Sequence, residues 1–558
     1  MKQRVIDLSA AGDKLFGARQ NLDSLWQTIG DNFYVERADF TSKRTVGDEY
    51  ASHLMTGFPS IVRRDLANQF AAMFRPRGVP WFHIKTEDND LNEQQPVKVA
   101  LDRMTRIQYR AMYDNRSGFV RAMHEGDHDV AAFGQAVLQT SRNRDMDGLF
   151  YQLHHLRDVA WAENEYLTVD TVHRKQKLDA RCLVKYFGKY GTVSPDVTRI
   201  AKTEPFKEFN IRHIVVPTDD YDLEKGKNPR RLPFVSIYID VDNQVILEET
   251  ATKRLGYTIR RWQTVSGSQY ARSPATEICL PDARLIQQMN LTILEAAEKA
   301  VEPPSIAVEE AINGGVNLMA RGITYVSAEY DEKTGAALRP YPIDSSGIQW
   351  GQKEREHIHE MLMQGFYINQ IKLPEIQAGM TAYEMHQRVE EYIRQNAPLF
   401  EPMEQDNGAI CGDTFDLLMD LGAFGNLGET LPEELRGQEI KFVFDSPLQE
   451  ARGKAKTQAF LESMQVMGAA IQYDQGAVYD FDMRKGKNDA IEGTGAPPDW
   501  ILPDAAALAA REQATQAAAQ QKEAEDAAQG IGLLGAGAEA AGNAASSLGA
   551  INQAVAGL

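Results

Sequence analysis

The sequence predicts an α+β fold in which helical segments flank a central, mainly antiparallel β-rich segment. Apolar residues recur at helical spacing in residues 1–133, whereas residues 137–272 carry runs of β-branched and aromatic residues between turn formers. Residues 280–372 then have the pattern of a long helix, a short β insert and a second long helix. A chain of 558 residues exceeds one hydrophobic core, so we expect several domains.

The N-terminal part is expected to form amphipathic helices. Their apolar faces fall within residues 22–33, 61–74, 96–113 and 117–133. Aromatic side chains such as Trp26 lie on these faces, and we interpret them as core residues.

The fourth of these helices carries an H-E-x-x-H pattern at His124, Glu125 and His128. In zinc hydrolases, two histidines one helical turn apart bind the metal and the glutamate activates water. Gly126 weakens a helix that would have to hold both ligands, Asp127 adds a carboxylate, and no third-ligand segment follows. We therefore expect no metal site here, and a zinc-dependent hydrolase remains the alternative reading of the chain.

The β-rich segment contains runs that predict strands. They lie at residues 166–169, 211–216, 234–240 and 257–262, and turn formers such as those at 240–243 separate them. This pattern indicates a mainly antiparallel domain.

Two long helices are expected around the β insert. The first begins at Pro281 and ends before Pro303, and the second runs from Gly347 to about Asn369. Each has an apolar stripe on an otherwise polar surface, so each needs a neighbour to cover it, which suggests assembly into a ring. The stripes include Leu285, Ile286, Ile358, Met361 and Leu362.

The insert between these helices is expected to hold three short strands. They are predicted at residues 305–308, 317–326 and 336–343, and Gly-containing turns at 313–315 and 331–335 separate them.

The remaining residues are expected to be mostly helical. A breaker-rich link at residues 372–379 precedes a helix from about residue 381, which Pro398 and Pro402 separate from another helix at 407–421. Later helices are expected at residues 449–467, 477–488 and 504–529, and the Gly/Ala/Ser-rich residues 530–558 are expected to be flexible.

Composition excludes several classes of protein. Asp and Glu number 79 against 60 Lys and Arg, and this net charge of −19 argues against a protein that coats DNA through clustered cations. The 3 cysteines are far apart, which predicts neither a disulfide framework nor a zinc knuckle. Neither a signal peptide nor a membrane span is expected, and Gly453-Lys454-Ala455 does not complete a P-loop.

Several segments resemble, in the same order, segments of a known protein family, and they lie at residues 75–82, 125–134, 161–174, 185–188, 261–275, 380–388 and 442–448. The resemblance is to the portal, or head-to-tail connecting, proteins of short-tailed, podovirus-type phages, and it covers about residues 22–502. Where family members often have a Tyr-Gly-Arg-Gly-Pro-like segment, this chain departs with Ala271 and Ser273.

The resemblance implies a portal fold with a mixed α/β wing, a two-helix stem, a small β-rich clip and a helical crown or barrel, assembled as a dodecameric ring. The ring would occupy one capsid vertex and pass double-stranded DNA without sequence specificity. The boundaries it implies are 1–279 for the first part of the wing, 280–302 for the first stem helix, 303–346 for the clip, 347–370 for the second stem helix, 371–447 for the rest of the wing with a tunnel loop, 448–503 for the crown and 504–558 for a barrel helix and tail.

The resemblance also indicates where DNA and partners would meet the chain. Residues 280–372 carry 13 acidic and 8 basic side chains, and if these faced the channel they would repel phosphate and let DNA slide. The candidate channel residues are Lys353, Arg355, Lys372 and Gln377. The candidate clip residues for terminase or tail-adaptor contact are Asn313, Gly314, Asp331, Glu332 and Lys333.

The partners that follow are the major capsid protein, scaffold, the terminase large subunit, a tail adaptor or head-completion protein, and internal ejection proteins. The subunit would lie at the portal vertex of the virion and, during assembly, in the host bacterial cytoplasm. No enzymatic activity, cofactor, metal or membrane is expected. A second alternative is another ring-forming virion protein, such as an adaptor or an ejection protein.

Overall fold

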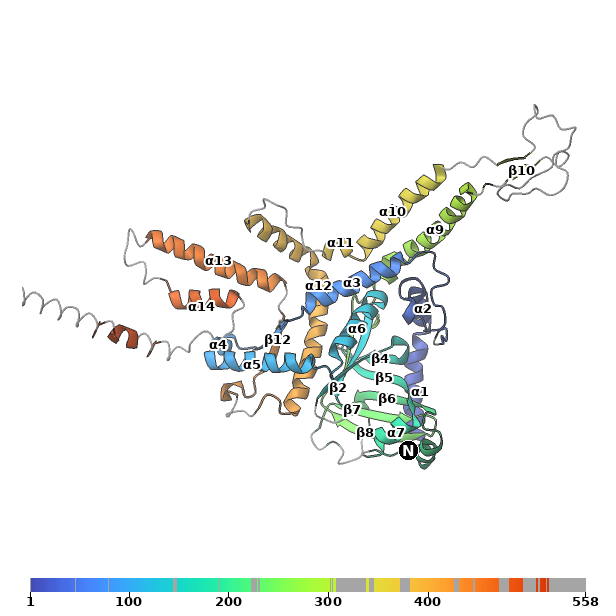
Figure 1. Ribbon diagram of the computed structural model, residues 1–558. Coiled ribbons are helices and arrows are strands. Elements are labelled where there is room, and N and C mark those ends of the chain that lie inside the picture. Colours follow the sequence, from blue (N-terminus) through green and yellow to red (C-terminus); the bar gives the residue numbers. More distant parts are fainter. Residues whose placement is uncertain are drawn as a thin grey trace, which may run out of the picture. The chain divides into compact units, whose positions relative to one another are not determined.

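Helices and sheets follow the order that the sequence predicts, and the chain is α+β (Figure 1). The computed structural model describes residues 2–45, 47–78, 80–143, 148–189, 191–221, 228, 231–301, 303, 305–307, 338–340, 346–371, 382–425, 431–444, 447–470, 481–494, 508–509, 512–517 and 519–520. By its internal contacts the chain divides into two units, one of residues 1–84, 104–426 and 442–451 and one of residues 85–103, 427–441 and 452–558.

The first unit begins with three amphipathic helices. They are α1 (Lys2–Ala18), α2 (Gln20–Phe33) and α3 (Phe58–Phe74). The predicted apolar face of α2 is buried through Trp26, Ile29 and Phe33. A fourth helix, α6 (Phe119–Phe133), begins after Gly118 and ends at Gly134, both in the left-handed region that suits glycine.

Helix α6 packs on a three-stranded antiparallel sheet of order β3-β2-β9. Its strands are β2 (Gln135–Arg142), β3 (Leu149–His154) and β9 (Tyr257–Arg261). The register pairs Val137 with both His154 and Ile259. This sheet therefore holds the central strand β2 between the two others, directly beneath the helix that carries the H-E-x-x-H pattern.

A second antiparallel sheet has the order β4-β5-β6-β7-β8. Val5 of α1 packs with Ile214 and Ile237 on one face. Because side chains alternate along a strand, Phe209 and Ile211 point to the other face, where they meet α7 and α8. The elements are β4 (Val159–Glu163), β5 (Val169–Asp179), α7 (Ala180–Phe187), α8 (Pro195–Thr203), β6 (Glu208–Pro217), β7 (Phe234–Asp240) and β8 (Val245–Thr252).

Two features of this sheet differ from the sequence-based expectation. Residues 166–168, predicted to start a strand, form the turn between β4 and β5, and β5 begins only at Val169. The helices α7 and α8, which the β-rich pattern hides, are inserted between β5 and β6.

The expected pair of long helices is present as α9 (Leu280–Val301) and α10 (Ser346–Gly365), which lie side by side (Figure 1). A π-helical turn, η4 (Ala275–Cys279), runs directly into α9, so the helical backbone starts before Pro281. The second expected helix ends earlier than Asn369, because Tyr367 has a positive φ of 58° and a short helix, α11 (Ile368–Ile371), follows. Between α9 and α10, β10 (Ser305–Ala307) pairs antiparallel with β11 (Leu338–Pro340).

The proline break predicted after residue 381 is wrong. Helix α12 (Ala382–Asp420) continues through Pro398 and Pro402. Proline has no backbone N–H, so Pro402 cannot donate to the carbonyl of residue 398. The two prolines therefore remove backbone hydrogen bonds without ending the helix. Propensity was outweighed here because the C-terminal half is buried at Met403, Ile410 and Leu418.

Strands β1 (Phe82–Thr86) and β12 (Ile440–Phe444) form a two-stranded sheet, and the chain passes from one unit to the other within both. The other helices are α4 (Asn89–Glu93), α5 (Gln95–Met112), α13 (Pro447–Ala470) and α14 (Met483–Gly493). In the second unit, Thr457 of α13 donates to the carbonyl of Ala490 of α14 at 2.9 Å. Of the predicted C-terminal helix at 504–529, only short helical pieces within residues 508–520 are described.

Candidate functional site

The paired helices α9 and α10 are the candidate functional site, and small residues let them approach closely. A Cβ atom on Gly351 of α10 would lie 3.2 Å from Cγ1 of Ile293 on α9. At the other end of α10, a Cβ atom on Gly365 would collide with the Sγ atom of Cys279. Between these two contacts Ile286 is fully buried, as are Ile358 and Leu362. Side chains at helical spacing therefore form one narrow apolar seam between the helices.

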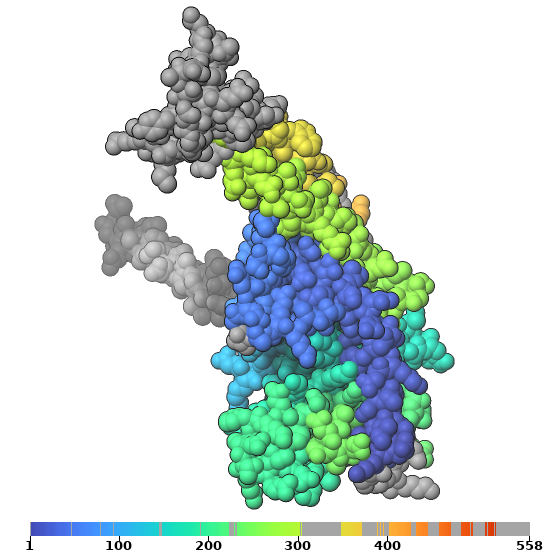
Figure 2. Space-filling model, turned by 90° about the vertical axis from the view of Figure 1, so that its right-hand side faces the viewer, coloured from blue at the N-terminus to red at the C-terminus, as the bar shows by residue number. Residues whose placement is uncertain are grey.

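A loop from the N-terminal part fastens α9. The side-chain oxygen of Gln287 accepts hydrogen bonds from the backbone N–H groups of Met55 at 2.7 Å and Thr56 at 2.9 Å. Its amide nitrogen donates to the carbonyl oxygen of Thr56 at 2.9 Å. Helix α10 is fastened nearby, because the ring of His359 stacks on Phe58 with centroids 3.7 Å apart. Figure 2 shows N-terminal residues, in blue, beside one end of the green α9.

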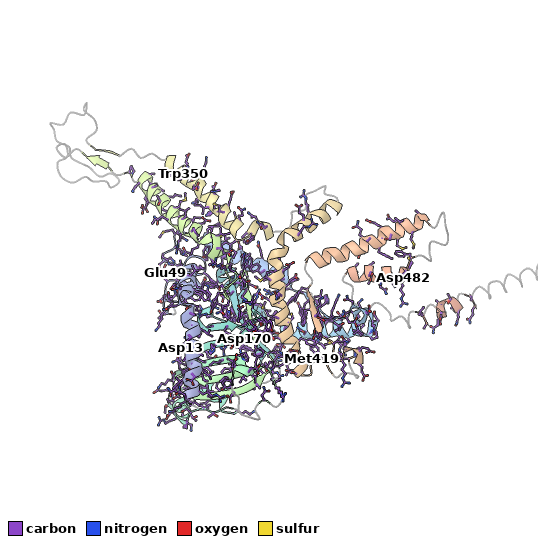
Figure 3. All side chains as sticks on the ribbon, turned by 180° about the vertical axis from the view of Figure 1, so that it is seen from behind. Asp13, Glu49, Asp170, Trp350, Met419 and Asp482 are labelled. Atoms are coloured by element: carbon purple, nitrogen blue, oxygen red, sulfur yellow. The ribbon has the colours of Figure 1, made fainter. Side chains whose placement is uncertain are left out.

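Two of the stripe residues predicted to be buried are exposed in the single chain. Leu285 is 52% exposed and Met361 is 41% exposed, because they lie beside the seam and outside it. Trp350, at the end of α10 nearest β10 in Figure 3, is 68% exposed. The paired helices thus keep apolar side chains on their outer surface, where a single chain has nothing to cover them.

Two of the four candidate channel residues lie in the part of the chain that the structure describes. Lys353 is exposed on α10, and Arg355 is half-buried, one helical turn before His359. Residues two apart on a helix do not face each other, so α10 does not bring Lys353 and Arg355 together. Lys372 and Gln377 lie outside the described residues. The same holds for the five candidate clip residues, Asn313, Gly314, Asp331, Glu332 and Lys333.

The H-E-x-x-H pattern on α6 forms no metal site in this geometry. The rings of His124 and His128 lie edge to face, with centroids 4.6 Å apart. However, Nδ1 of His128 is hydrogen-bonded to Arg63 at 2.5 Å, and burial, with the charge of Arg63, lowers the pKa of His128 to about 4. A guanidinium in that position repels a metal dication. Glu125 instead pairs with Arg121 at 2.8 Å. The described residues include no group of three or more His, Cys, Asp or Glu that could hold a metal ion.

Gly126 and Asp127, the two variable positions of the pattern, each have a structural role. A Cβ atom on Gly126 would lie 3.4 Å from both Nη1 of Arg260 and Cδ1 of Leu153, so α6 packs in direct contact with side chains of the sheet at this residue. Asp127 is fully buried and forms ion pairs with Arg75 and, at 2.8 Å, with Arg260. Two buried guanidinium groups require such a carboxylate. The pattern is therefore part of the core that supports the helices.

The comparison with protein families now bears on this architecture. The family model of the bacteriophage head to tail connecting protein matches residues 7–502. The chain belongs to this family. The match includes the three-stranded and five-stranded sheets, the paired helices and all of α12, α13 and α14, so it confirms the resemblance proposed from the sequence.

Two relatives have names that agree with the family. The probable portal protein of Bordetella phage BPP-1 is 25% identical over 537 residues, which cover 94% of this chain and 92% of that protein. The portal protein of Salmonella phage epsilon15 is 22% identical over 521 residues, with 91% of each chain covered. This protein is therefore a structural portal subunit of the phage virion. Across the described residues, no helix combines the length and apolarity that crossing a bilayer requires.

Sequence reasoning missed the residues that fix α9 and α10 in place. Gln287 resembles any polar helix residue, and its partners Met55 and Thr56 are more than 200 residues away. The contact between Cys279 and Gly365 could not be predicted either, because no sequence pattern indicated the π-helical turn that ends at Cys279. Small residues on a predicted apolar stripe were the one available hint.

Proposed function

We propose that twelve copies of this chain close into a ring at one capsid vertex, and that double-stranded DNA is packaged and ejected through its central channel. The match to the head-to-tail connecting family over residues 7–502 carries this proposal. The chain would act by geometry, because the channel guides DNA that a separate terminase ATPase moves. It would have no enzymatic activity of its own.

The outer surface of the paired helices supports assembly into a ring. Large apolar side chains stand exposed along both helices, and burying them against neighbouring copies removes this surface from water. They include Leu285, Leu294, Val301, Trp350 and Met361.

The regions of the portal fold would follow the boundaries expected from the sequence. The paired helices would form the stem, residues 303–346 the clip, and α13 with α14 part of the crown. Lys353, Arg355, Lys372 and Gln377 would be sparse channel contacts. The clip residues Asn313, Gly314, Asp331, Glu332 and Lys333 would meet the terminase large subunit and later the tail adaptor. Capsid protein, scaffold and ejection proteins would contact other surfaces, with assembly in the host cytoplasm.

Native mass spectrometry with electron microscopy of the same purified sample tests the proposal. Twelve chains of 62.3 kDa predict about 750 kDa with an open centre in end views. Leu294→Asp should lower the ring fraction without changing subunit helicity, because Leu294 is 54% exposed in the single chain. A particle without a central channel would contradict the proposal.

The hydrolase alternative has its own test on the same sample. Zinc content should be far below one ion per chain, because the guanidinium of Arg63 lies against the ring of His128 and its charge repels a dication. Zinc at one ion per chain that disappears in His128→Ala would overturn the structural reading of this motif.

A further inference from the structure

The turn between β4 and β5 exposes two large apolar side chains at its tip. Tyr166 is 77% exposed and Leu167 is 73% exposed. Leu167 also has a φ of 59°, a left-handed conformation that glycine or asparagine adopts at lower cost. Stability of the single chain therefore explains neither the exposure nor the choice of leucine.

Hydrogen bonds nevertheless hold this turn in one conformation. The side-chain oxygen of Asn164 accepts from the N–H groups of Tyr166 at 3.0 Å and Thr168 at 3.1 Å, and from the Thr168 hydroxyl at 2.8 Å. The N–H of Leu167 donates to the carbonyl of Asn164 at 3.1 Å. An apolar tip that is already ordered loses little conformational entropy when it binds.

The residues of the turn itself are acidic. Residues 162–171 contain three carboxylates and no cation. Glu163 is paired with Arg261, which leaves Glu165, exposed at the tip, and Asp170, labelled in Figure 3, at the start of β5. A surface that receives this turn should therefore be basic and should offer apolar or aromatic contacts.

Such a surface lies at the other end of the same strand. Residues 180–207, which form α7 and α8 and which we call the basic hairpin, carry six Lys or Arg and two carboxylates in a chain whose net charge is −19. On α7, Leu183 and Phe187 face the core, so Arg181 and Lys185, one turn apart, lie on the outer face. Phe206 is 68% exposed. The Cζ atom of Arg181 lies over its ring, 5.2 Å from the ring centroid.

One chain cannot join its own two surfaces. The turn leads directly into β5, and the basic hairpin begins directly after it, so the 11 residues of the strand separate them. At about 3.3 Å per residue the separation is about 35 Å. Figure 1 shows α7 beside β7 and β8, the strands farthest from β4 in the order of the sheet. Complementary surfaces at opposite ends of one rigid sheet can meet only between chains.

We propose that the β4–β5 turn of one chain docks on the basic hairpin of the next copy around the ring. Tyr166 and Leu167 contact Phe206 and Tyr186 of the neighbour, while Glu165 and Asp170 face its Lys185, Lys202 and Lys207. The contact pairs one surface of a chain with a different surface of its neighbour, which is the head-to-tail geometry that closes into a ring. The contact rests on the proposed ring and adds a specific interface to it.

Charge reversal tests the contact with the full-length chain. One variant carries Glu165→Lys and Asp170→Lys, and a second carries Lys185→Glu, Lys202→Glu and Lys207→Glu. Each alone places like charges on both sides of the contact, so the concentration at half-assembly should rise about tenfold or more, as native mass spectrometry measures it. A charge-matched control carries Glu433→Lys and Glu434→Lys, in the short helix η6 (Glu433–Leu435), and should assemble like the natural chain.

Mixing the two variants gives the sharper result. The reversed turn of the first fits the reversed hairpin of the second, and the converse contact pairs the natural turn with the natural hairpin. Rings should therefore return in the mixture with the two chains in equal number, and also in a single chain that carries all five substitutions. Circular dichroism of each variant checks that the subunits fold.

Leu167→Asn separates docking from folding. Asparagine tolerates the positive φ, so the midpoint of thermal unfolding of the subunit should stay constant or rise, whereas assembly should weaken. The inference is overturned if reversed chains assemble within about twofold of the natural chain, or if mixing restores nothing. Natural chains that form no ring would instead contradict the proposed function itself, so the two failures are distinguishable.

Discussion

Gly365 of α10 lies directly against the Sγ atom of Cys279, the last residue of the π-helical turn before α9. Burial raises the pKa of the Cys279 thiol to about 12, so the sulfur is a neutral, buried packing atom. This contact sets how closely the two long helices approach at the end where they join the rest of the unit. The π-helical turn on one side and the positive φ of Tyr367 on the other place backbone irregularities at the same level.

Gly365→Ala should therefore destabilise the chain, although alanine normally favours helices. The added methyl group overlaps with the sulfur, and overpacking of this kind costs about 1–3 kcal/mol. Cys279→Ala alone should cost about 1 kcal/mol for the lost sulfur, and the double variant should be less destabilised than the sum of the two. Urea unfolding measures all three.

The control for this prediction is Gly412→Ala on α12. Nothing lies within 4 Å of a Cβ atom built there, so alanine should stabilise the helix by roughly 0.5–1 kcal/mol. If Gly365→Ala behaved like Gly412→Ala, the close approach of the helices would be wrong.

Asp127→Asn should be among the most damaging single substitutions in the first unit. It leaves Arg75 and Arg260, which are buried, without their shared carboxylate, and breaking a buried pair costs about 3–5 kcal/mol. Glu125→Gln, two residues earlier on the same helix, should cost less than about 0.5 kcal/mol because its partner Arg121 is 85% exposed. Soluble yield and urea unfolding compare the two, and equal effects would contradict the ionic centre.

Sequence patterns were sufficient for elements with strong periodicity. The spacing of Ile286, Ile358 and Leu362 predicted one apolar stripe on each helix. The expectation that a neighbouring copy covers these three residues was wrong, because they are already buried in the seam between α9 and α10 of one chain. The same reasoning misplaced Leu285 and Met361, because a stripe on one chain does not say which residues face its own partner and which face another copy.

Local propensity misled where a single side chain decides the backbone. Tyr166 to Thr168 are good strand formers, but hydrogen bonds to Asn164 bend them into a turn. Helix α7 is only 8 residues long, too short for periodicity to separate it from a strand. Ion pairs such as Asp127 with Arg260, 133 residues apart, have no local signal at all.

Asp406→Asn should stabilise the chain at alkaline pH. Burial raises the pKa of Asp406 to about 7, against the opposing charges of Arg260 and Arg261. A carboxyl group whose pKa is raised on folding favours the folded state at low pH, and this contribution falls as pH rises from about 4 to about 7. Asparagine can still accept the N–H of Arg261, which lies 3.1 Å from the carboxyl oxygen.

The measurement is the midpoint of thermal unfolding of Asp406→Asn relative to the natural chain. The variant should gain roughly 1–3 °C at pH 8 and clearly less at pH 5, because at pH 5 the carboxyl of the folded chain is protonated and only that of the unfolded chain is ionised. Buried His154 and His173, whose pKa values are lowered to about 2 and about 4 by burial, destabilise both chains below about pH 6.5. This background cancels in the difference, and an equal gain at pH 5 and pH 8 would contradict the buried-carboxyl account.

Gln287→Ala should release the loop that carries Met55 and Thr56 from α9. The natural side chain satisfies both backbone N–H groups and donates to the Thr56 carbonyl, so its loss frees two amides at once. With a net contribution of about 1 kcal/mol per hydrogen bond, hydrogen–deuterium exchange at these amides should accelerate about tenfold.

Gln287→Glu should act in the same direction, because a carboxylate cannot donate to the carbonyl of Thr56. Gln288→Ala, the exposed neighbour on the same helix, is the matched control and should leave exchange unchanged. Equal exchange in all three variants would mean that the loop is held by Phe58 and His359 alone, and that the orientation of α9 does not depend on Gln287.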